Sequence, residues 1–462
     1  MVAGRSAGGS PSNGWLAGSD GSGRACADAR AICERTMIHL AWAIVERILP
    51  RVASALIMLV LAARLTPPLV GMYAWMVLAL TLVQTVGDTA ARQTAVVHGG
   101  TEAGDRFVRR FRVWSALIGG AVLAATVGAL LLTHHAEDRW QAIALTPFVL
   151  VPAASAVGID ALVRLQRAGR WKEIASHQAW SSLASLLCSV PTLLLTGSLL
   201  ASALQAMLAE AGFALLNRRR AARLPRASAA DARSREPTVN VLGDYLHTAL
   251  FSLLGWGQGQ TDRLSIGALA GGGRLGQYAF AMSLSRSIGD AAALAAINVL
   301  RPILAEAARD GRGSEIVSVT EASLRRSLVL AVMAAVATSI GAEVVVDPFL
   351  ADGWGPALAL VPVLALSVVP SVVAWSVTAV LQAESRMRWA SPIKAVGVLL
   401  SLPVGVVALH DLQLAAWLVN ARELVVMALL LLAARHRAPW RGGLLALGIV
   451  MVGAAVWQVT RG

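Results

Sequence analysis

The sequence predicts an all-α polytopic membrane protein with two pseudo-symmetric six-helix lobes, twelve core transmembrane helices, and an extra span at the C-terminal end. Of its 462 residues, 56% are hydrophobic and only 15% are charged, whereas soluble domains average about 45–50% and about 25%. Apolar stretches of about 20 residues recur along the chain, which is enough to cross a hydrocarbon core of about 30 Å. These stretches are continuous rather than alternating, which favours helices over barrel strands.

Thirteen apolar stretches are predicted to span the membrane, and basic residues alternate between the connections that join them. The predicted spans are 38–63, 71–91, 113–133, 140–163, 174–195, 198–216, 241–269, 275–300, 327–346, 356–381, 393–409, 412–433 and 442–459. The N-terminal tail and the even-numbered connections hold thirty-one Lys and Arg residues, against four in the odd-numbered connections and the C-terminus. Basic residues in short loops stay cytoplasmic, so this alternation places the N-terminus in the cytoplasm. It also explains the net charge of +13 without a nucleic-acid partner.

Composition divides the chain into five parts: 1–36, a disordered cytoplasmic tail; 37–216, a six-helix lobe; 217–240, a basic cytoplasmic linker; 241–434, a second six-helix lobe; and 435–462, an extra transmembrane helix. The tail contains no apolar core typical of a signal peptide. The three cysteines form no metal-binding or disulfide pattern, so we expect no metal and no cofactor.

The two lobes carry an internal repeat. "LVGMYAW" at 69–75 and "RLGQYAF" at 274–280 share Gly-x-Tyr-Ala-aromatic with an offset of 205 residues, and each opens the second span of its lobe. The same offset relates Pro50 to Gly255, so both first spans contain a helix-weakening residue at a corresponding depth. Because each lobe has six spans, the repeat is parallel, with its axis along the membrane normal.

These motifs resemble the polysaccharide (O-antigen type) flippases of the multidrug/oligosaccharidyl-lipid/polysaccharide exporter superfamily. The similar residues are Asp262 to Gly267, followed by Gly276, Tyr278 and Ala281. The resemblance covers about residues 38–434 and implies movement of an undecaprenyl-diphosphate-linked oligosaccharide across the bacterial cytoplasmic (inner) membrane by alternating access. It also implies contact with membrane lipids and, as partners, a polysaccharide polymerase and glycosyltransferases.

Such a substrate needs cations within the membrane, because a diphosphate is anionic and Arg donates paired hydrogen bonds to phosphate. We predict that Arg51, Arg47, Arg263 and Arg286 face a cationic lumen. Arg47 equally fits the membrane interface, and Arg286 equally fits an ion pair with Asp290, four residues further on. Arg422 precedes Glu423 and is predicted to be structural.

Carboxylates within spans are candidates for ion coupling, because a coupled transporter needs a group whose occupancy changes during its cycle. The candidates are Asp88, Asp290 and Asp262. A structural pair between Asp88 and Arg92 is the favoured alternative for the first. In the stretch "GWGQGQTDRLSIG", Gly255, Gly257 and Gly259, together with Pro50, are predicted hinges where the helices bend as access alternates.

Other functions fit less well. A drug or cation antiporter of the same superfamily should have mainly acids in its lumen. A transporter of the major facilitator type should carry a second loop similar to Gly-x-x-x-Asp-Arg-x-Gly-Arg, and the stretch "GDTAARQTAVVHGG" does not have this pattern. A membrane glycan polymerase usually has a large external loop, and the external loops here are short. No GxxxxGK[ST] motif occurs, which excludes a P-loop ATPase on this chain, and no catalytic constellation predicts an enzyme.

Overall fold

A computed structural model describes residues 42, 50–98, 102–134, 136, 138–224, 241–384, 386–435 and 438–461, and within them it contains helices and no β-strand. Ten helical segments in this described part are long and apolar enough to cross a membrane. The helix at 50–64 and the two arms of the long helix α10 lie where the other three spans are predicted. The predicted fold class is therefore confirmed.

The first half begins with the helix at 50–64 and continues through nine further elements. They are α2 (Pro67–Gln84), the π-helix η1 (Thr85–Ala90), α3 (Ala91–His98), α4 (Glu102–Thr133), α5 (Arg139–Ala144), η2 (Thr146–Leu150), α6 (Val151–Arg167), α7 (Trp171–Thr196) and α8 (Leu200–Ala221). Pro67 lies in the first turn of α2, where its missing N–H costs nothing. Gly197 adopts φ 58° and ends α7, which permits the short turn into α8.

The second half begins with α10 (Val241–Arg309), which is two helices joined at Gly271, where φ is 86° and ψ is 172°. The later elements are α11 (Gly313–Gly341), η3 (Ala342–Val346), η4 (Asp347–Phe349), α12 (Gly355–Leu366), α13 (Val368–Ala383), η5 (Met387–Trp389), α14 (Ala390–Ala408), α15 (Leu412–Ala433) and α16 (Trp440–Arg461). Glycine reaches a positive φ without steric cost, which suits the sharp turn at this residue.

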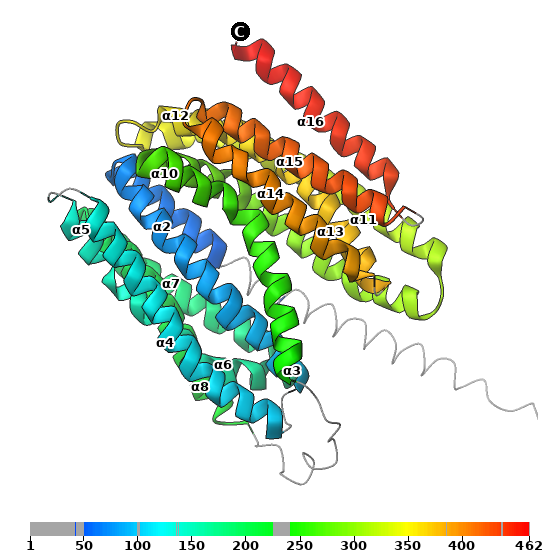
Figure 1. Cartoon of the computed structure of the whole chain (residues 1–462), viewed down its shortest axis with the longest axis horizontal. Coiled ribbons are helices and arrows are strands. Elements are labelled where there is room, and N and C mark those ends of the chain that lie inside the picture. The colour runs from blue at the N-terminus through cyan, green and yellow to red at the C-terminus, as the bar shows by residue number, and fades with distance from the viewer. Residues whose placement is uncertain are drawn as a thin grey trace, which may run out of the picture.

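The helices form two bundles, with α2 and α10 side by side between them (Figure 1). One bundle contains α4, α6, α7 and α8, and the other contains α11 to α15. Between its start and its turn, the green part of α10 changes direction (Figure 1). Helix α8 runs to Ala221, inside the segment predicted as the linker, and ends with three arginines that favour a helix C-terminus. The whole predicted tail, 1–36, lies outside the described residues. Of the predicted linker, 217–224 are described and 225–240 are not.

The two copies of the Gly-x-Tyr-Ala motif meet at a close helix crossing. A Cβ atom on Gly71 would lie 2.0 Å from the carbonyl oxygen of Gly272, and one on Gly276 would lie 2.0 Å from the carbonyl oxygen of Pro67. The offset of 205 residues that relates Gly71 to Gly276 also relates Pro67 to Gly272. The contact is therefore reciprocal, as expected across a two-fold axis, and only glycine lets the backbones approach so closely.

Other contacts join the halves at the same end. Trp354 donates a hydrogen bond from its indole Nε1 to the Leu65 carbonyl at 3.1 Å, and the Ala351 N–H donates to the Ala62 carbonyl at 3.2 Å. Buried residues of both halves, including Ile57, Tyr73 and Phe280, share one apolar core. Because the connections before α2 and α12 and the turn in α10 are predicted to be external, this shared core lies at the predicted extracytoplasmic end.

The extra C-terminal helix, α16, packs on the second bundle. It lies along the outside of that bundle (Figure 1), where it contacts α11, α13 and α15. Gly442 allows a close approach to Leu324, since a Cβ there would lie 2.2 Å from a Leu324 methyl carbon. This helix therefore adds to the second bundle and does not separate the two halves.

Candidate functional site

A buried carboxylate, Asp262, lies within the first arm of α10. Its side chain is fully buried, and the Tyr278 hydroxyl on the second arm donates a hydrogen bond to its Oδ2 at 2.6 Å. The Arg422 guanidinium of α15 lies 3.8 Å from the same oxygen. The two arms and α15 are thus joined at one buried point, which explains the Asp and Tyr of the motif in physical terms.

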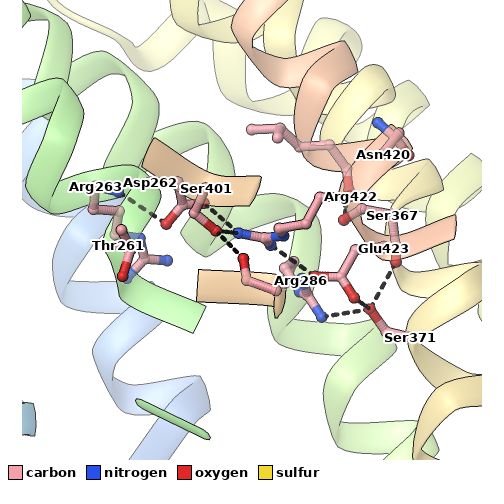
Figure 2. Close-up of polar contacts among 12 residues, drawn as sticks. Thr261, Asp262, Arg263, Arg286, Ser367, Ser371, Ser401, Asn420, Arg422 and Glu423 are labelled. Atoms are coloured by element: carbon pink, nitrogen blue, oxygen red, sulfur yellow. Dashed lines mark hydrogen bonds and ion pairs between the residues drawn. The ribbon is translucent and has the colours of Figure 1, made fainter. Parts of the chain in front are cut away.

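Arg422 is the centre of the polar cluster shown in Figure 2. Its Nη2 lies 2.7 Å from Glu423 Oε1, and its Nη1 donates to the Ser401 hydroxyl of α14 at 2.7 Å. Asp262, Arg422 and Glu423 are the buried charged side chains in the described part of the chain. Each would be costly alone in a membrane, so their mutual pairing is what makes their burial tolerable.

The cluster continues from Glu423 to a second ion pair. The Ser371 hydroxyl of α13 is 3.2 Å from Glu423 Oε2 and accepts a hydrogen bond from Arg286 Nη2 at 3.0 Å. Arg286 also pairs with Asp290 at 3.2 Å. Of the two predictions for Arg286, the geometry shows the i, i+4 pair. We call Asp262, Tyr278, Arg286, Asp290, Ser371, Ser401, Arg422 and Glu423 the polar network.

Arg263 follows Asp262 but has a different partner, as expected for adjacent helix positions. Its Nη1 donates to Gln260 Oε1 at 3.0 Å, and its buried Nε has no hydrogen-bond partner in the described structure. The two side chains leave α10 in different directions (Figure 2). Arg263 is therefore a cation beside the polar network whose side chain pairs with no carboxylate among the described residues.

The other predicted cations and acids are only partly described. Arg51 is exposed at the start of the helix at 50–64 and forms no hydrogen bond or ion pair with the described residues. Arg47 lies outside the described residues. The backbone of Asp88 belongs to η1, whereas its side chain lies outside the described part. The proposed pair between Asp88 and Arg92 thus stays a prediction.

The predicted hinge residues lie in helical backbone. Gly255, Gly257 and Gly259 all fall within α10, whose only non-helical residue is Gly271. A Cβ on Gly259 would meet nothing within 4 Å, while one on Gly257 would lie 3.2 Å from Val398. Pro50 opens the described part of the first helix. Bending at these residues stays a prediction.

Sequence reasoning missed two aspects of this region. Arg422 was expected to be structural, but its contact with Asp262 joins helices 160 residues apart in sequence, which no local spacing reveals. Lys394 lies within the predicted span 393–409 and in the second turn of α14, but it was not among the predicted cations. In the described residues, no group of three or more His, Cys, Asp or Glu side chains has an arrangement that suits a metal ion.

Comparisons with known proteins agree with this architecture. Among solved structures, the chain is similar to the lipid II flippase MurJ in an inward closed conformation, with 10% identity, 91% of each chain covered and a TM-score of 0.63. It is similar to an inward-facing multidrug resistance MATE family transporter of the MOP superfamily, with 12% identity, 91% of this chain and 100% of that chain covered, and a TM-score of 0.60. A MOP superfamily transporter from Pyrococcus furiosus, described as having a binding pocket of reverse polarity, gives 14% identity, 90% and 95% coverage, and a TM-score of 0.55.

At such identities the structural likeness shows the fold, which is that of the MOP superfamily transporters. No curated protein matches the sequence. Residues 60–359 match the model of a family described as "Polysaccharide biosynthesis protein". Because this match covers more than half of its length, the chain belongs to the polysaccharide biosynthesis protein family.

Proposed function

We propose that the chain moves an undecaprenyl-diphosphate-linked oligosaccharide across the bacterial cytoplasmic membrane by alternating access, for surface polysaccharide biosynthesis. Membership of a polysaccharide biosynthesis family supports the class of cargo. The lipid II flippase MurJ, which has the same fold, acts on a lipid-linked cargo by its own description. The N-terminus is proposed to be cytoplasmic, in line with the distribution of basic residues.

The observation that carries the proposal is the sign of the charges left without a counter-charge. The buried carboxylates Asp262 and Glu423 are both paired with Arg422. By contrast, Arg263 and Arg51 pair with no carboxylate in the described part of the chain. A cation inside a span costs at least about 2.5–3.5 kcal/mol and needs water or an anion to offset it. This polarity favours an anionic diphosphate over a cationic drug.

The contacts between the halves support alternating access. The reciprocal crossing of Gly71 and Gly276, together with the bond from Trp354 to the Leu65 carbonyl, holds the bundles together at the predicted external end. Away from that end, three apolar cores belong to one half only, and a small one joins Tyr245 of α10 to Ala90 and Ile159 of the first half. We interpret this arrangement as a state that is closed outside, from which the external contacts separate to release cargo.

Ion coupling at Asp262 or Asp290 would require displacement of an arginine. Asp262 has Arg422 at 3.8 Å, and Asp290 has Arg286 at 3.2 Å. We therefore propose that these two acids stabilise the second bundle, and that Asp88 is the acid best suited to coupling.

The experiment is complementation of a deletion strain in the organism that encodes the chain. We expect the deletion to accumulate lipid-linked precursor in the cytoplasmic leaflet and to lose surface polysaccharide, and the wild-type chain to restore both. Arg51→Gln and Arg263→Gln should complement poorly at normal protein levels. Arg64→Gln is the matched control, because Arg64 is an exposed arginine at the other end of the same helix as Arg51. Normal export without precursor in the deletion strain would refute the proposal, and export of cationic dyes instead would favour a drug antiporter.

A further inference from the structure

A second group of cations lies outside the polar network, on α14 and the second arm of α10. Lys394 is one of only two lysines in the chain. Its ammonium nitrogen lies over the Phe251 ring, 3.8 Å from the ring centroid. Arg301 is exposed, and its positive charge lies close enough to act on that of Lys394. Two like charges in proximity favour an anion that contacts both.

Gly255 makes room for the ammonium group of Lys394. A Cβ atom at residue 255 would lie 3.1 Å from Lys394 Nζ, closer than an ordinary van der Waals contact. The absence of a side chain lets the ammonium lie against the α10 backbone, directly above Phe251. This gives Gly255 a structural reason that does not depend on helix bending.

Nothing in the described structure neutralises Lys394. It forms no hydrogen bond or ion pair with the described residues, and Phe251 is its one described partner. An aromatic face attracts a cation without accepting its three N–H groups as an oxygen would. The ammonium is thus oriented by the ring while its donors stay available to a ligand.

We propose that Lys394 and Arg301 form a second phosphate subsite that binds the diphosphate of the lipid-linked cargo on the cytoplasmic side. The inference rests on the proposed function. A compact ammonium and a planar guanidinium both bind phosphate, and together they match the two charges of a diphosphate. Lys394 lies in the second turn of α14, whose start is predicted to be cytoplasmic. Gly255 is eight residues before Arg263 on α10, a separation of about 12 Å along the helix. The cargo would meet this subsite before it reaches Arg263.

Binding to the purified full-length protein in nanodiscs tests the subsite. The probes are undecaprenyl diphosphate, inorganic diphosphate and phosphatidylglycerol, and the variants are Lys394→Met and Lys394→Arg. Loss of a charge-assisted hydrogen bond predicts at least about a tenfold higher Kd for undecaprenyl diphosphate in Lys394→Met. Lys394→Arg should stay within about threefold of wild type, because it keeps the charge.

The chain provides a matched control. Lys172, the other lysine, also lies over an aromatic ring, with its Nζ 5.9 Å from the Trp42 centroid, so Lys172→Met should leave the Kd unchanged. Gly255→Val keeps Lys394 but fills the space at its ammonium, and it should weaken binding as well. Gly128→Val is its control, because a Cβ on Gly128 meets nothing within 4 Å.

The outcomes distinguish a failure of the proposed function from a failure of the subsite alone. If the wild type fails to bind undecaprenyl diphosphate, the proposed function and the subsite both fail. If the wild type binds and Lys394→Met and Gly255→Val bind equally well, only the subsite is refuted. An equal loss for phosphatidylglycerol, or equal wild-type affinity for inorganic diphosphate, would also overturn it, by indicating a general lipid site or a free-anion site.

Discussion

Replacing Gly71 with Ala should open the external crossing. A Cβ at this residue would lie 2.0 Å from the Gly272 carbonyl oxygen, whereas ordinary contact begins at 3.4 Å. The helices would have to separate by more than an ångström. Since the obstructing atoms are backbone, no side chain can rotate away. The added strain applies to the closed state and is relieved once the halves part.

Overpacking of this kind typically costs about 1–3 kcal/mol. If the cost falls on the closed state alone, the ratio of closed to open molecules falls by a factor of about 5–150. Gly276→Ala should act in the same direction, because its contact with Pro67 is the reciprocal one. The double variant should add little, since either methyl group already separates the crossing.

The assay is labelling of a cysteine by a membrane-impermeant maleimide from outside the cell. Leu65 is only 5% exposed and its carbonyl accepts the Trp354 bond, so Leu65→Cys in a background without native cysteines reports opening. Gly71→Ala should increase the labelling rate, and Gly128→Ala, which meets no neighbour within 4 Å, should not. Equal rates in the two variants, at equal protein levels, would refute the view that this crossing closes the external side.

Three further predictions concern the second bundle. Arg422→Leu leaves two buried carboxylates unpaired, so it should cost about 3–5 kcal/mol of stability and lower the thermal unfolding midpoint in detergent; adding Glu423→Gln should recover part of the loss, and a lack of recovery would contradict the pairing. Tyr278→Phe removes a hydrogen bond to the Asp262 carboxylate, which is worth about 1.5–3 kcal/mol. It should lower the same midpoint more than Tyr73→Phe, whose buried hydroxyl lies near the neutral Ser54 side chain. Gly259→Ala fills open space and favours the helix by about 0.5–1 kcal/mol. It should therefore raise the midpoint slightly, but slow transport in the complementation assay if bending there is part of the cycle; unchanged transport would argue against the hinge.

The fold followed from the sequence because each of its signals is local. Spans about 20 residues long, basic loops and the repeated Gly-x-Tyr-Ala motif all act over short stretches, and the membrane constrains what they can form. The offset that relates Gly71 to Gly276 places the two glycines at matching positions in the two lobes. It does not predict that their helices cross there, because a glycine in a sequence does not reveal which backbone approaches it.

The site was harder to predict, because pairing across helices decides whether a charge is neutralised. Asp262 and Arg422 lie on helices far apart in sequence, and their proximity depends on how α10, α14 and α15 pack. The i, i+4 spacing of Arg286 and Asp290 was visible, yet it left a ligand role equally open. Lys394 was missed for another reason: the sequence does not show that Phe251, on a different helix, lies against it.

The repeat relates the two lobes, whereas the polar network belongs to the second lobe alone. At the offset of 205 residues, the counterpart of Asp262 is Ile57, which is buried in the apolar core. The network is thus confined to the second half, where its members come from α10, α13, α14 and α15. Because no member belongs to the first half, the network can stay intact while the two bundles separate. The external contacts that must break are the symmetric ones at Gly71 and Gly276 and the hydrogen bonds from Trp354 and Ala351, and none of them involves a charge. Breaking them exposes no buried ion, so the bundles can separate without the large desolvation cost that a charged gate would carry.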